Sequence, residues 1–380
     1  MVYIICFLIS SLFFWLSEKQ KKNTVFFASI AIFIPCFLAG IRADSVGTDV
    51  SVYLEPMILN AKSAQNFQSY LLSSWQQGWV VRGVNDIEIG FSFLVYSIIK
   101  LFNSRHVLQF VIQALTIIPI YIGLVKRKEK NLWIGMLVYF CFFYNISLNI
   151  MRQAIAMAFV FCAFQYLMEK KNVQFWIIML SACLFHTTAL VGFVLYFMYE
   201  YLEFRIFKKS KRIQTTKKRT YFLLIAGMLV LVAQSYLAKI FETVGLSYYV
   251  HYFEGTIEFL PNQIINRLPI MLACVLLSKQ LINNLGEEFY FNICCVVYAI
   301  IFSQFASVNS STYRIAMYFS IFFINLVPEI CTCTSRFRFG KDKVLKINRY
   351  FMICYCIVWW IYYCLIMIDS SIPYKTDLFI

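Results

Sequence analysis

Residues 131–168 read NLWIGMLVYFCFFYNISLNIMRQAIAMAFVFCAFQYLM and form two apolar runs, 131–147 and 150–168, in which Arg152 is the one charged side chain. A helix that crosses a membrane needs about 20 predominantly apolar residues. Because lipid offers the backbone no hydrogen bonds, such a run satisfies its own polar groups as an α-helix. The stretch therefore predicts an all-α, polytopic transmembrane protein.

The composition of the whole chain agrees with this prediction. Its 380 residues are 61% hydrophobic and 14% charged, whereas soluble domains are about 45–50% apolar and about 25% charged. A soluble enzyme, a disordered tail and a secreted disulfide scaffold are excluded. The net charge of +15 is spread over short clusters between apolar runs. A nucleic-acid-binding protein shows a continuous basic stripe instead, so we expect no nucleic-acid partner.

Further apolar runs fill most of the chain. Together they predict about 10–13 membrane segments in a single integral membrane domain, residues 1–380. Their ends are expected to be correct to within about four residues. Besides the two quoted above, the runs cover 2–16, 24–41, 89–102, 107–125, 173–184, 187–204, 220–238, 266–282, 289–306, 314–333 and 350–368.

The basic loops predict which side of the membrane each connection faces, because Lys and Arg are retained in the cytoplasm. Loops such as Lys126–Lys130 and Arg205–Arg219 are then cytoplasmic, and residues 42–88 and 239–265 form two extracytoplasmic loops. Counts made from the two ends of the chain disagree across 89–106. Either one of the flanking runs does not cross the membrane, or one basic loop breaks the charge rule.

The loop 42–88 opens with the sequence RADSVGTDVSVY, which starts at Arg42. Its glycine permits a tight turn, and Thr48 is placed to cap a short helix in which Asp49 and Tyr53 share a face. Arg42 would lie where a lipid phosphate meets the membrane boundary. The alternative is a salt-bridged helix end with Arg42 extended toward water, and the sequence leaves both interpretations open.

Arg152 lies near the start of the second quoted run, with Asn149, Gln153 and Ala156 on the same predicted helix face. An arginine in an apolar stretch is costly unless it is paired or hydrated, so such a residue indicates function. A phosphate or pyrophosphate suits the guanidinium fork. The alternative is a buried ion pair that only fixes packing.

Two more polar segments interrupt the apolar runs. His186, within Phe185-His186-Thr187-Thr188, is predicted in a turn, where a histidine can act as base, acid or ligand. The alternative is a structural hydrogen bond. Arg314 is predicted in the first turn of a helix whose N-terminus carries partial positive charge, which indicates an anion site. An unrelated salt bridge is the alternative there.

In this order, the segments resemble the EpsG-like family of Wzy-type polysaccharide polymerases over nearly the whole chain. The resemblance rests on Arg42…Gly47-Thr48-Asp49…Tyr53, Arg152-Gln153 with the alanine-rich helix after it, Phe185-His186-Thr187, Tyr313-Arg314 followed by Tyr318-Phe319, and Pro373-Tyr374-Lys375, with Glu88 as a further acidic match.

The resemblance implies a GT-C-like glycosyltransferase in the bacterial plasma (inner) membrane, with its site on the periplasmic or extracellular side. Such an enzyme joins oligosaccharide repeat units carried on undecaprenyl pyrophosphate and releases undecaprenyl pyrophosphate. Besides these lipid-linked oligosaccharides and the bilayer, a chain-length regulator of the Wzz type is a partner expected of the family.

The resemblance also gives the candidate residues their expected roles. Arginines would bind the pyrophosphate and stabilise the charge of the leaving group, and a carboxylate or histidine would orient or deprotonate the acceptor hydroxyl. Since arginines can replace a metal ion here, we expect no cofactor and no obligatory divalent metal. The pyrophosphate-binding candidates are Arg42, Arg152 and Arg314, the catalytic candidates are Asp44, Asp49 and His186, and the glycan-binding candidates are Tyr53, Glu88, Gln153 and Tyr313.

Two other functions fit an apolar chain of this kind. A multi-pass O-acyltransferase with His186 as base would need this histidine near a cytoplasmic acyl donor, and its predicted outer position argues against that. A flippase or other transporter of lipid-linked oligosaccharides would line a path through both leaflets, whereas the polar candidates gather on one predicted side.

Overall fold

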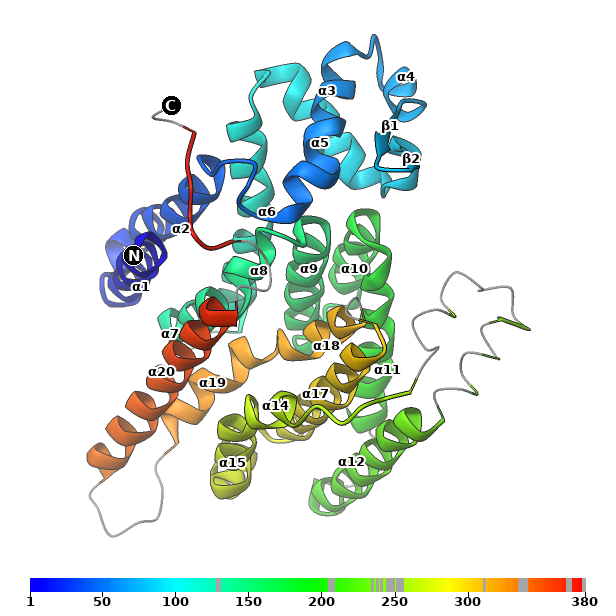
Figure 1. Ribbon diagram of the computed structural model, residues 1–380. Helices are drawn as coiled ribbons and strands as arrows, with labels where there is room; N and C mark the ends of the chain where they lie inside the picture. The colour runs from blue at the N-terminus through cyan, green and yellow to red at the C-terminus, as the bar shows by residue number, and fades with distance from the viewer. Residues whose placement is uncertain are drawn as a thin grey trace. The chain divides into compact units, whose positions relative to one another are not determined.

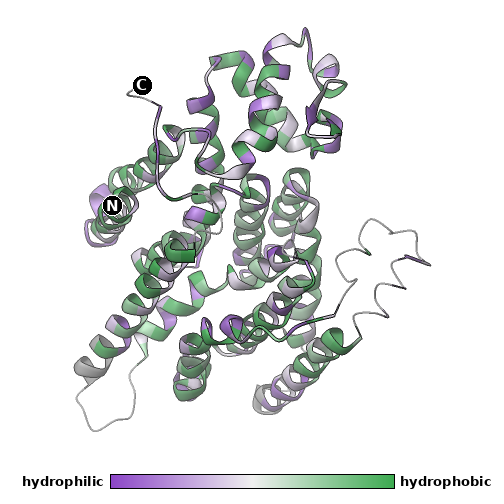
Figure 2. Cartoon of the chain, in the orientation of Figure 1, coloured by the Kyte–Doolittle hydropathy of each residue, from purple (hydrophilic) through white to green (hydrophobic). Residues whose placement is uncertain are grey.

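The computed structural model describes residues 1–127, 131–203, 209–233, 236, 239, 242–243, 250, 256–309, 312–333, 341–366 and 371–377. These residues fall into two compact units. Unit 1 comprises Met1–Leu190 and Cys356–Ile380, and unit 2 comprises Val191–Tyr355. Within each unit, most of the helical residues are hydrophobic (Figure 2).

Six helices are long and apolar enough to cross a membrane, and the number rises to eight if two bent pairs each form one crossing. The two pairs bend by 81° and 41°. Four more apolar helices have only 10–17 residues. The prediction of an all-α polytopic membrane protein is confirmed. The six long segments are Val2–Lys19, Lys21–Gly40, Arg105–Lys126, Met151–Met168, Glu288–Ser307 and Ile347–Ile366.

Unit 1 is built around α6, which packs against α2 on one side and α9 on another, while α9 also packs against α10 (Figure 1). The helices and strands are α1 (Val2–Lys19), α2 (Thr24–Gly40), α3 (Glu55–Ser63), α4 (Phe67–Leu71), β1 (Ser74–Gln77), β2 (Val80–Gly83), α5 (Ile89–Phe102), α6 (Arg105–Lys126), α7 (Leu132–Tyr139), α8 (Asn145–Ser147), α9 (Met151–Met168) and α10 (Asn172–Phe185).

Small residues explain why α6 and α9 lie so close together. A Cβ built on Gly123 of α6 would stand 2.7 Å from the ring of Phe161 on α9. Ala156 and Ala163 of α9 are fully buried. Helices in lipid gain stability from close packing over small residues, so these residues hold α9 closely against α6.

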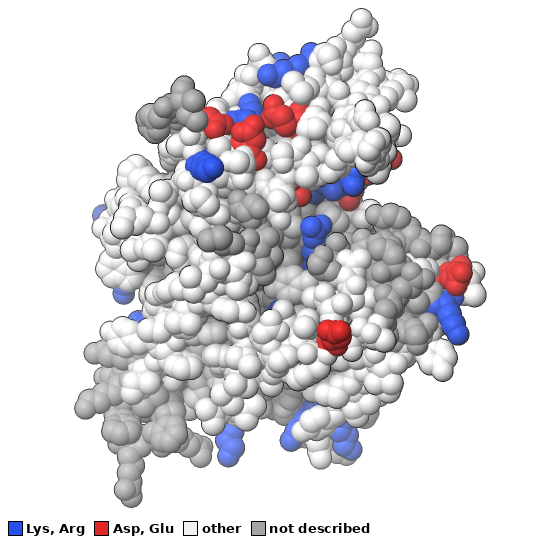
Figure 3. All heavy atoms as spheres, viewed as in Figure 1, with Lys and Arg blue, Asp and Glu red and all other residues white. Residues whose placement is uncertain are grey.

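The predicted extracytoplasmic loop 42–88 is folded. After a π-helical turn, Val50–Leu54, it continues through α3 and α4 into the antiparallel hairpin β1–β2, in which Trp75 pairs with Arg82. Apolar side chains of the loop, including Val50 and Met57, share one core cluster with residues of α5, α6 and α9. In the space-filling view, charged side chains of unit 1 gather at the end that carries α3 and the hairpin (Figure 3).

Helix length bears on the topological conflict across 89–106. With 14 residues, α5 spans about 21 Å, which is short of the hydrocarbon thickness of about 30 Å. With 22 residues, α6 is long enough to cross. The lengths favour α5 as the run that does not cross the membrane.

Unit 2 is also helical, and α17 packs against α12 and α18. Thirteen of the 27 residues of the predicted loop 239–265 lie outside the described residues. In the described part, the Leu260 N–H donates to Gln304 Oε1 over 2.9 Å. The helices of unit 2 are α11 (Val191–Glu203), α12 (Lys209–Val232), α14 (Pro261–Ile265), α15 (Leu268–Leu276), α16 (Ser278–Leu285), α17 (Glu288–Gln304), α18 (Tyr313–Ser320), α19 (Phe323–Thr332) and the first part of α20 (Lys341–Ile366). The last part of α20 belongs to unit 1.

Candidate functional site

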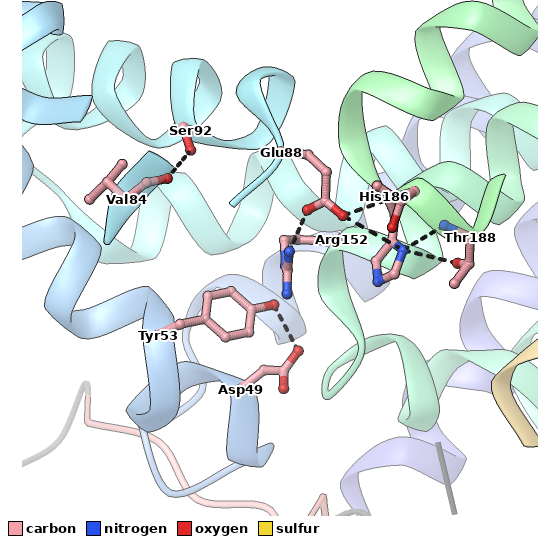
Figure 4. Close-up of polar contacts among 9 residues, drawn as sticks. Asp49, Tyr53, Val84, Glu88, Ser92, Arg152, His186 and Thr188 are labelled. Atoms are coloured by element: carbon pink, nitrogen blue, oxygen red, sulfur yellow. Dashed lines mark hydrogen bonds and ion pairs between the residues drawn. The ribbon is translucent and has the colours of Figure 1, made fainter. Parts of the chain in front are cut away.

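An ion pair joins Glu88, the N-cap residue of α5, to Arg152 in the first turn of α9 (Figure 4). Their side chains are 12% and 20% exposed. The second carboxylate oxygen of Glu88 accepts the backbone N–H of Thr187 over 3.1 Å. A Cβ on Gly90 would lie 2.7 Å from the carbonyl oxygen of Leu184. Glycine therefore lets the start of α5 press against the end of α10, which brings Glu88 to its partners.

Tyr53 and Asp49 extend this group of polar residues. The Arg152 guanidinium carbon lies 4.9 Å from the centre of the Tyr53 ring, a cation–π contact. The Tyr53 hydroxyl donates to Asp49 Oδ2 over 2.7 Å. His186 Nδ1 lies 3.8 Å from Glu88 Oε1. We call Asp49, Tyr53, Glu88, Arg152 and His186 the polar cluster.

The polar cluster brings together candidates from four separate segments of the sequence. Arg152 does have a carboxylate partner, as the ion-pair interpretation required, but this pair lies among other candidate residues.

Gly47 makes the turn that carries Asp49 into the cluster. Its φ is +88°, and an added Cβ would lie 2.5 Å from the carbonyl oxygen of Leu148, so both the backbone angle and the close approach favour glycine. The hydroxyl of Thr48 donates to Asn149 Oδ1. Thr48 does not cap a helix as predicted, because the turn Val50–Leu54 follows directly after Asp49 and no side-chain hydrogen bond caps it. Asn149 itself precedes α9 and does not share its helical face as predicted.

Arg42 is the most unusual charge in unit 1. It lies two residues after α2 and is only 2% exposed, so it does not extend toward water. Its Nη2 donates to the sulfur of Met151 over 3.2 Å. The Nε and Nη1 nitrogens have no hydrogen-bond partner, and no carboxylate of the described residues forms an ion pair with this guanidinium.

The C-terminal segment 371–377 lies along the Arg42 backbone. The Ala43 N–H donates to the Lys375 carbonyl over 3.0 Å, and the Thr376 hydroxyl donates to the Ile41 carbonyl over 2.6 Å. The Tyr374 hydroxyl donates to the Leu38 carbonyl over 2.9 Å. From the sequence, only the family resemblance pointed to Tyr374 and Lys375. The structure shows that their segment contacts the chain on both sides of Arg42.

Arg105 holds the acidic side chains around this segment. It pairs with Asp44 at 3.1 Å, with Glu55 at 3.9 Å and with Asp377. Asp44, a catalytic candidate, thus contacts Arg105 and is half exposed. Arg105 and Asp377 were not among the residues predicted from the sequence. A charged residue at the start of an apolar run was the available signal for Arg105.

Two pKa shifts describe the electrostatics of the cluster. Burial alone would raise the pKa of Glu88, but Arg152 and His186 together with backbone donors lower it below its ordinary value. Burial and the neighbouring Asp49 raise the pKa of Tyr53 well above its ordinary value. Tyr53 therefore acts as a phenol donor, and Glu88 remains ionised at neutral pH.

Three other candidates are not part of the polar cluster. Gln153 is buried on α9. Tyr313 and Arg314 are partly exposed at the start of α18 in unit 2, after the N-cap residue Thr312. Ser310 and Ser311, which precede this helix in the sequence, lie outside the described residues. The roles of Gln153, Tyr313 and Arg314 stay predictions.

The described residues contain no group of three or more His, Cys, Asp or Glu side chains arranged to hold a metal ion. Whether catalysis needs a divalent ion stays a prediction that chelation can test.

The family model that describes EpsG matches residues 25–376, a range that includes Arg42, the polar cluster and most of the C-terminal segment. This chain belongs to the EpsG family. Membership supports a polysaccharide polymerase-type role, and the apolar helices make this EpsG-family protein a multi-pass membrane protein. No curated protein and no solved structure matches the chain. The GT-C-like architecture of the EpsG-family protein therefore stays an expectation.

Proposed function

We propose that this EpsG-family protein is a glycosyltransferase that joins oligosaccharide repeat units linked to undecaprenyl pyrophosphate. It acts at the outer face of the bacterial plasma membrane and releases undecaprenyl pyrophosphate. The observation that carries the proposal is Arg42, a buried cation without a described counter-ion, two residues beyond a membrane-length helix.

The buried guanidinium of Arg42 needs a counter-ion. A buried charge is costly unless it is paired and hydrogen-bonded. Two guanidinium nitrogens of Arg42 have no partner among the described residues, and a diphosphate supplies several oxygen acceptors that suit them. A lipid diphosphate also reaches the membrane boundary, where Arg42 lies. The ligand thus provides the counter-ion that the described residues of unit 1 do not.

Asp49 of the polar cluster supports the glycan side of the same reaction. The acceptor hydroxyl oxygen forms a bond to the anomeric carbon of the growing chain, and its proton passes to the carboxylate of Asp49. The bond between the anomeric carbon and the diphosphate oxygen breaks, and the electron pair leaves with undecaprenyl pyrophosphate. Arg42 stabilises the charge of this leaving group, with Arg152 and Arg314 as the further predicted contributors.

The proposal includes no metal step. Polymerisation by the purified protein in EDTA is expected to continue, and a loss of activity that added Mg²⁺ or Mn²⁺ restores would contradict this. The bilayer and a chain-length regulator of the Wzz type are the further proposed partners.

The test uses a strain that lacks this chain, complemented with Arg42→Met or with the control Arg82→Gln. Arg82 is an exposed arginine of β2. Arg42→Met should lower polymer formation by at least about 100-fold and leave lipid-linked single repeats. Because replacing an unpaired buried charge with an apolar side chain leaves no orphaned partner, the melting temperature in detergent should stay equal or rise.

Arg82→Gln should give polymer of normal length. Normal-length polymer from Arg42→Met would refute the role of Arg42. In the uncomplemented strain, missing outward-facing repeat units would indicate a flippase, and normal-length polymer without acetyl groups would indicate an acyltransferase.

A further inference from the structure

His186 lies where α10 ends and a short 3-10 turn, Thr187–Leu190, begins. Its side chain is 15% exposed. The Thr188 backbone N–H donates to His186 Nδ1 over 3.1 Å, and the Thr188 hydroxyl lies 2.9 Å from the same nitrogen. Two contacts to Thr188, both on Nδ1, therefore hold the ring in this orientation.

These contacts determine which ring nitrogen carries hydrogen. A backbone N–H can only donate, so Nδ1 of His186 must offer a lone pair. The neutral ring then carries its hydrogen on Nε2. Turning the ring over would aim a C–H at the Thr188 N–H and lose both contacts.

Protonation does not change this assignment for Nε2. A proton added to Nδ1 would set two N–H donors against each other, and the contact with the Thr188 N–H would have to break. Glu88 Oε1, 3.8 Å from Nδ1, would then be the nearby acceptor. In the neutral ring and in the imidazolium alike, Nε2 bears a hydrogen. This nitrogen donates, and it cannot take a proton from a substrate hydroxyl.

The close-up shows the edge of the ring that carries Nε2 turned toward Arg152, on the side of the cluster where Tyr53 and Asp49 lie (Figure 4). A donor aimed in this direction and a cationic guanidinium both suit a negatively charged oxygen.

We infer that His186 is a catalytic hydrogen-bond donor whose Nε2–H binds a diphosphate oxygen of the lipid-linked substrate, and that it is not the base. The inference rests on the proposed function. As the bond from the anomeric carbon to the diphosphate oxygen breaks, charge grows on the diphosphate, and a preorganised donor stabilises it. No proton leaves His186 in this step, and the acceptor proton goes to Asp49.

Two substitutions separate the possible roles. In His186→Gln the amide nitrogen can occupy the place of Nε2 and keep a donor there, while the contact to Thr188 is lost. In His186→Asn the side-chain oxygen can occupy the place of Nδ1, so the variant keeps the contact to Thr188, as Asn does at helix N-caps, but loses the donor. His106→Asn is the matched control, since an amide nitrogen there can still donate to the Gly40 carbonyl, which lies 2.8 Å from His106 Nδ1.

The assay measures polymer formed by detergent-purified variants from lipid-linked repeat units extracted from the deletion strain. His186→Gln should keep activity to within about tenfold of the unsubstituted protein, and His186→Asn should lose about 100-fold or more, mainly in kcat. His106→Asn should match the unsubstituted protein.

Each other outcome overturns the inference. If His186→Asn keeps its activity, the histidine acts only as a helix cap. If both variants lose activity, the histidine acts as a base. Failure of the unsubstituted protein to make polymer would instead refute the proposed function, so the two failures are distinguishable.

Discussion

At the scale of single residues, Gly47 is needed for the geometry of the site although it has no side chain. Its φ of +88° disfavours any L side chain, and the Leu148 carbonyl leaves no room for a Cβ. Gly78, in the β1–β2 turn, also has positive φ (+59°), but a Cβ added there would meet nothing within 4 Å. A comparison of Gly47 with Gly78 therefore separates the cost of a positive φ from the cost of a clash with the backbone.

Gly47→Ala should lower the free energy of unfolding by about 3 kcal/mol or more, because strain in φ adds to a backbone clash. Gly78→Ala should cost only about 1–2 kcal/mol, the cost of the left-handed conformation. Thermal unfolding of both variants in detergent measures the difference. Equal melting temperatures would show that the approach of the 47–49 turn to Leu148 does not hold the site.

Glu88 gives a prediction about pH. A carboxylate whose pKa is lowered on folding contributes stability above its ordinary pKa, and this contribution disappears as the pH falls through the lowered value. Burial opposes the shift of the Glu88 pKa, while Arg152 and His186 produce it. The ion pair should therefore persist throughout the neutral and mildly acidic range.

Glu88→Gln should lower the free energy of unfolding by about 3 kcal/mol at pH 7, because it leaves the buried charge of Arg152 without its partner. The difference from the unsubstituted protein should shrink as the pH falls below the ordinary carboxylate pKa and through the lowered pKa of Glu88, where Glu88 itself becomes protonated. Melting temperatures across a pH series provide the measurement. A difference that stays constant over the whole acidic range in which both proteins remain folded would contradict the assigned ion pair.

At the scale of elements, the C-terminal segment 371–377 depends on α6. Backbone hydrogen bonds join it to residues 41–43, and Arg105 at the start of α6 binds Asp377. Because Arg105 also binds Asp44 and Glu55, one guanidinium ties the segment to the folded loop after α2. Removing the Arg105 guanidinium should therefore release both the C-terminal segment and the loop.

Arg105→Gln should raise the rate of tryptic cleavage after the exposed Lys375 several-fold, because local opening exposes the bond to the protease. Release of the peptide that starts at Thr376, followed by mass spectrometry in detergent, measures this rate. Arg82→Gln on β2 removes an arginine elsewhere and should leave the rate unchanged. An unchanged rate in Arg105→Gln would mean that the backbone bonds alone hold the segment.

At the scale of the whole molecule, α9 relates the site to the membrane. The helix starts beside Arg152 and ends at Met168, just before the basic loop Glu169–Lys171. Its 18 residues span about 27 Å. If α9 crosses the membrane, the polar cluster and this loop lie on opposite sides, and the charge rule places the loop in the cytoplasm.

Trp79→Cys, at the fully exposed tip of the hairpin, should react with a membrane-impermeant maleimide on intact cells. Lys171→Cys should react only after the membrane is permeabilised. The unsubstituted protein, with its own cysteines, gives the background. Labelling of position 79 only in permeabilised cells would reverse the proposed orientation and remove the site from the outer face.

The sequence alone was sufficient for the membrane class, for the approximate ends of most helices and for naming the five residues that the fold brings together as the polar cluster. Hydrophobic length and loop charge are local properties, so they can be recognised without knowing any contact. The run 89–102, for example, forms a helix over the same residues, Ile89–Phe102.

The partners of these residues depended on packing between distant segments. Glu88 and Arg152 are 64 positions apart, and Thr48 and Asn149 are 101 apart, so no local pattern could pair them. The isolation of Arg42 was equally invisible, because burial without a counter-ion is a property of everything that surrounds a residue. Close backbone packing at Gly47 and Gly90 created these contacts, and only the folded chain brings such distant segments together.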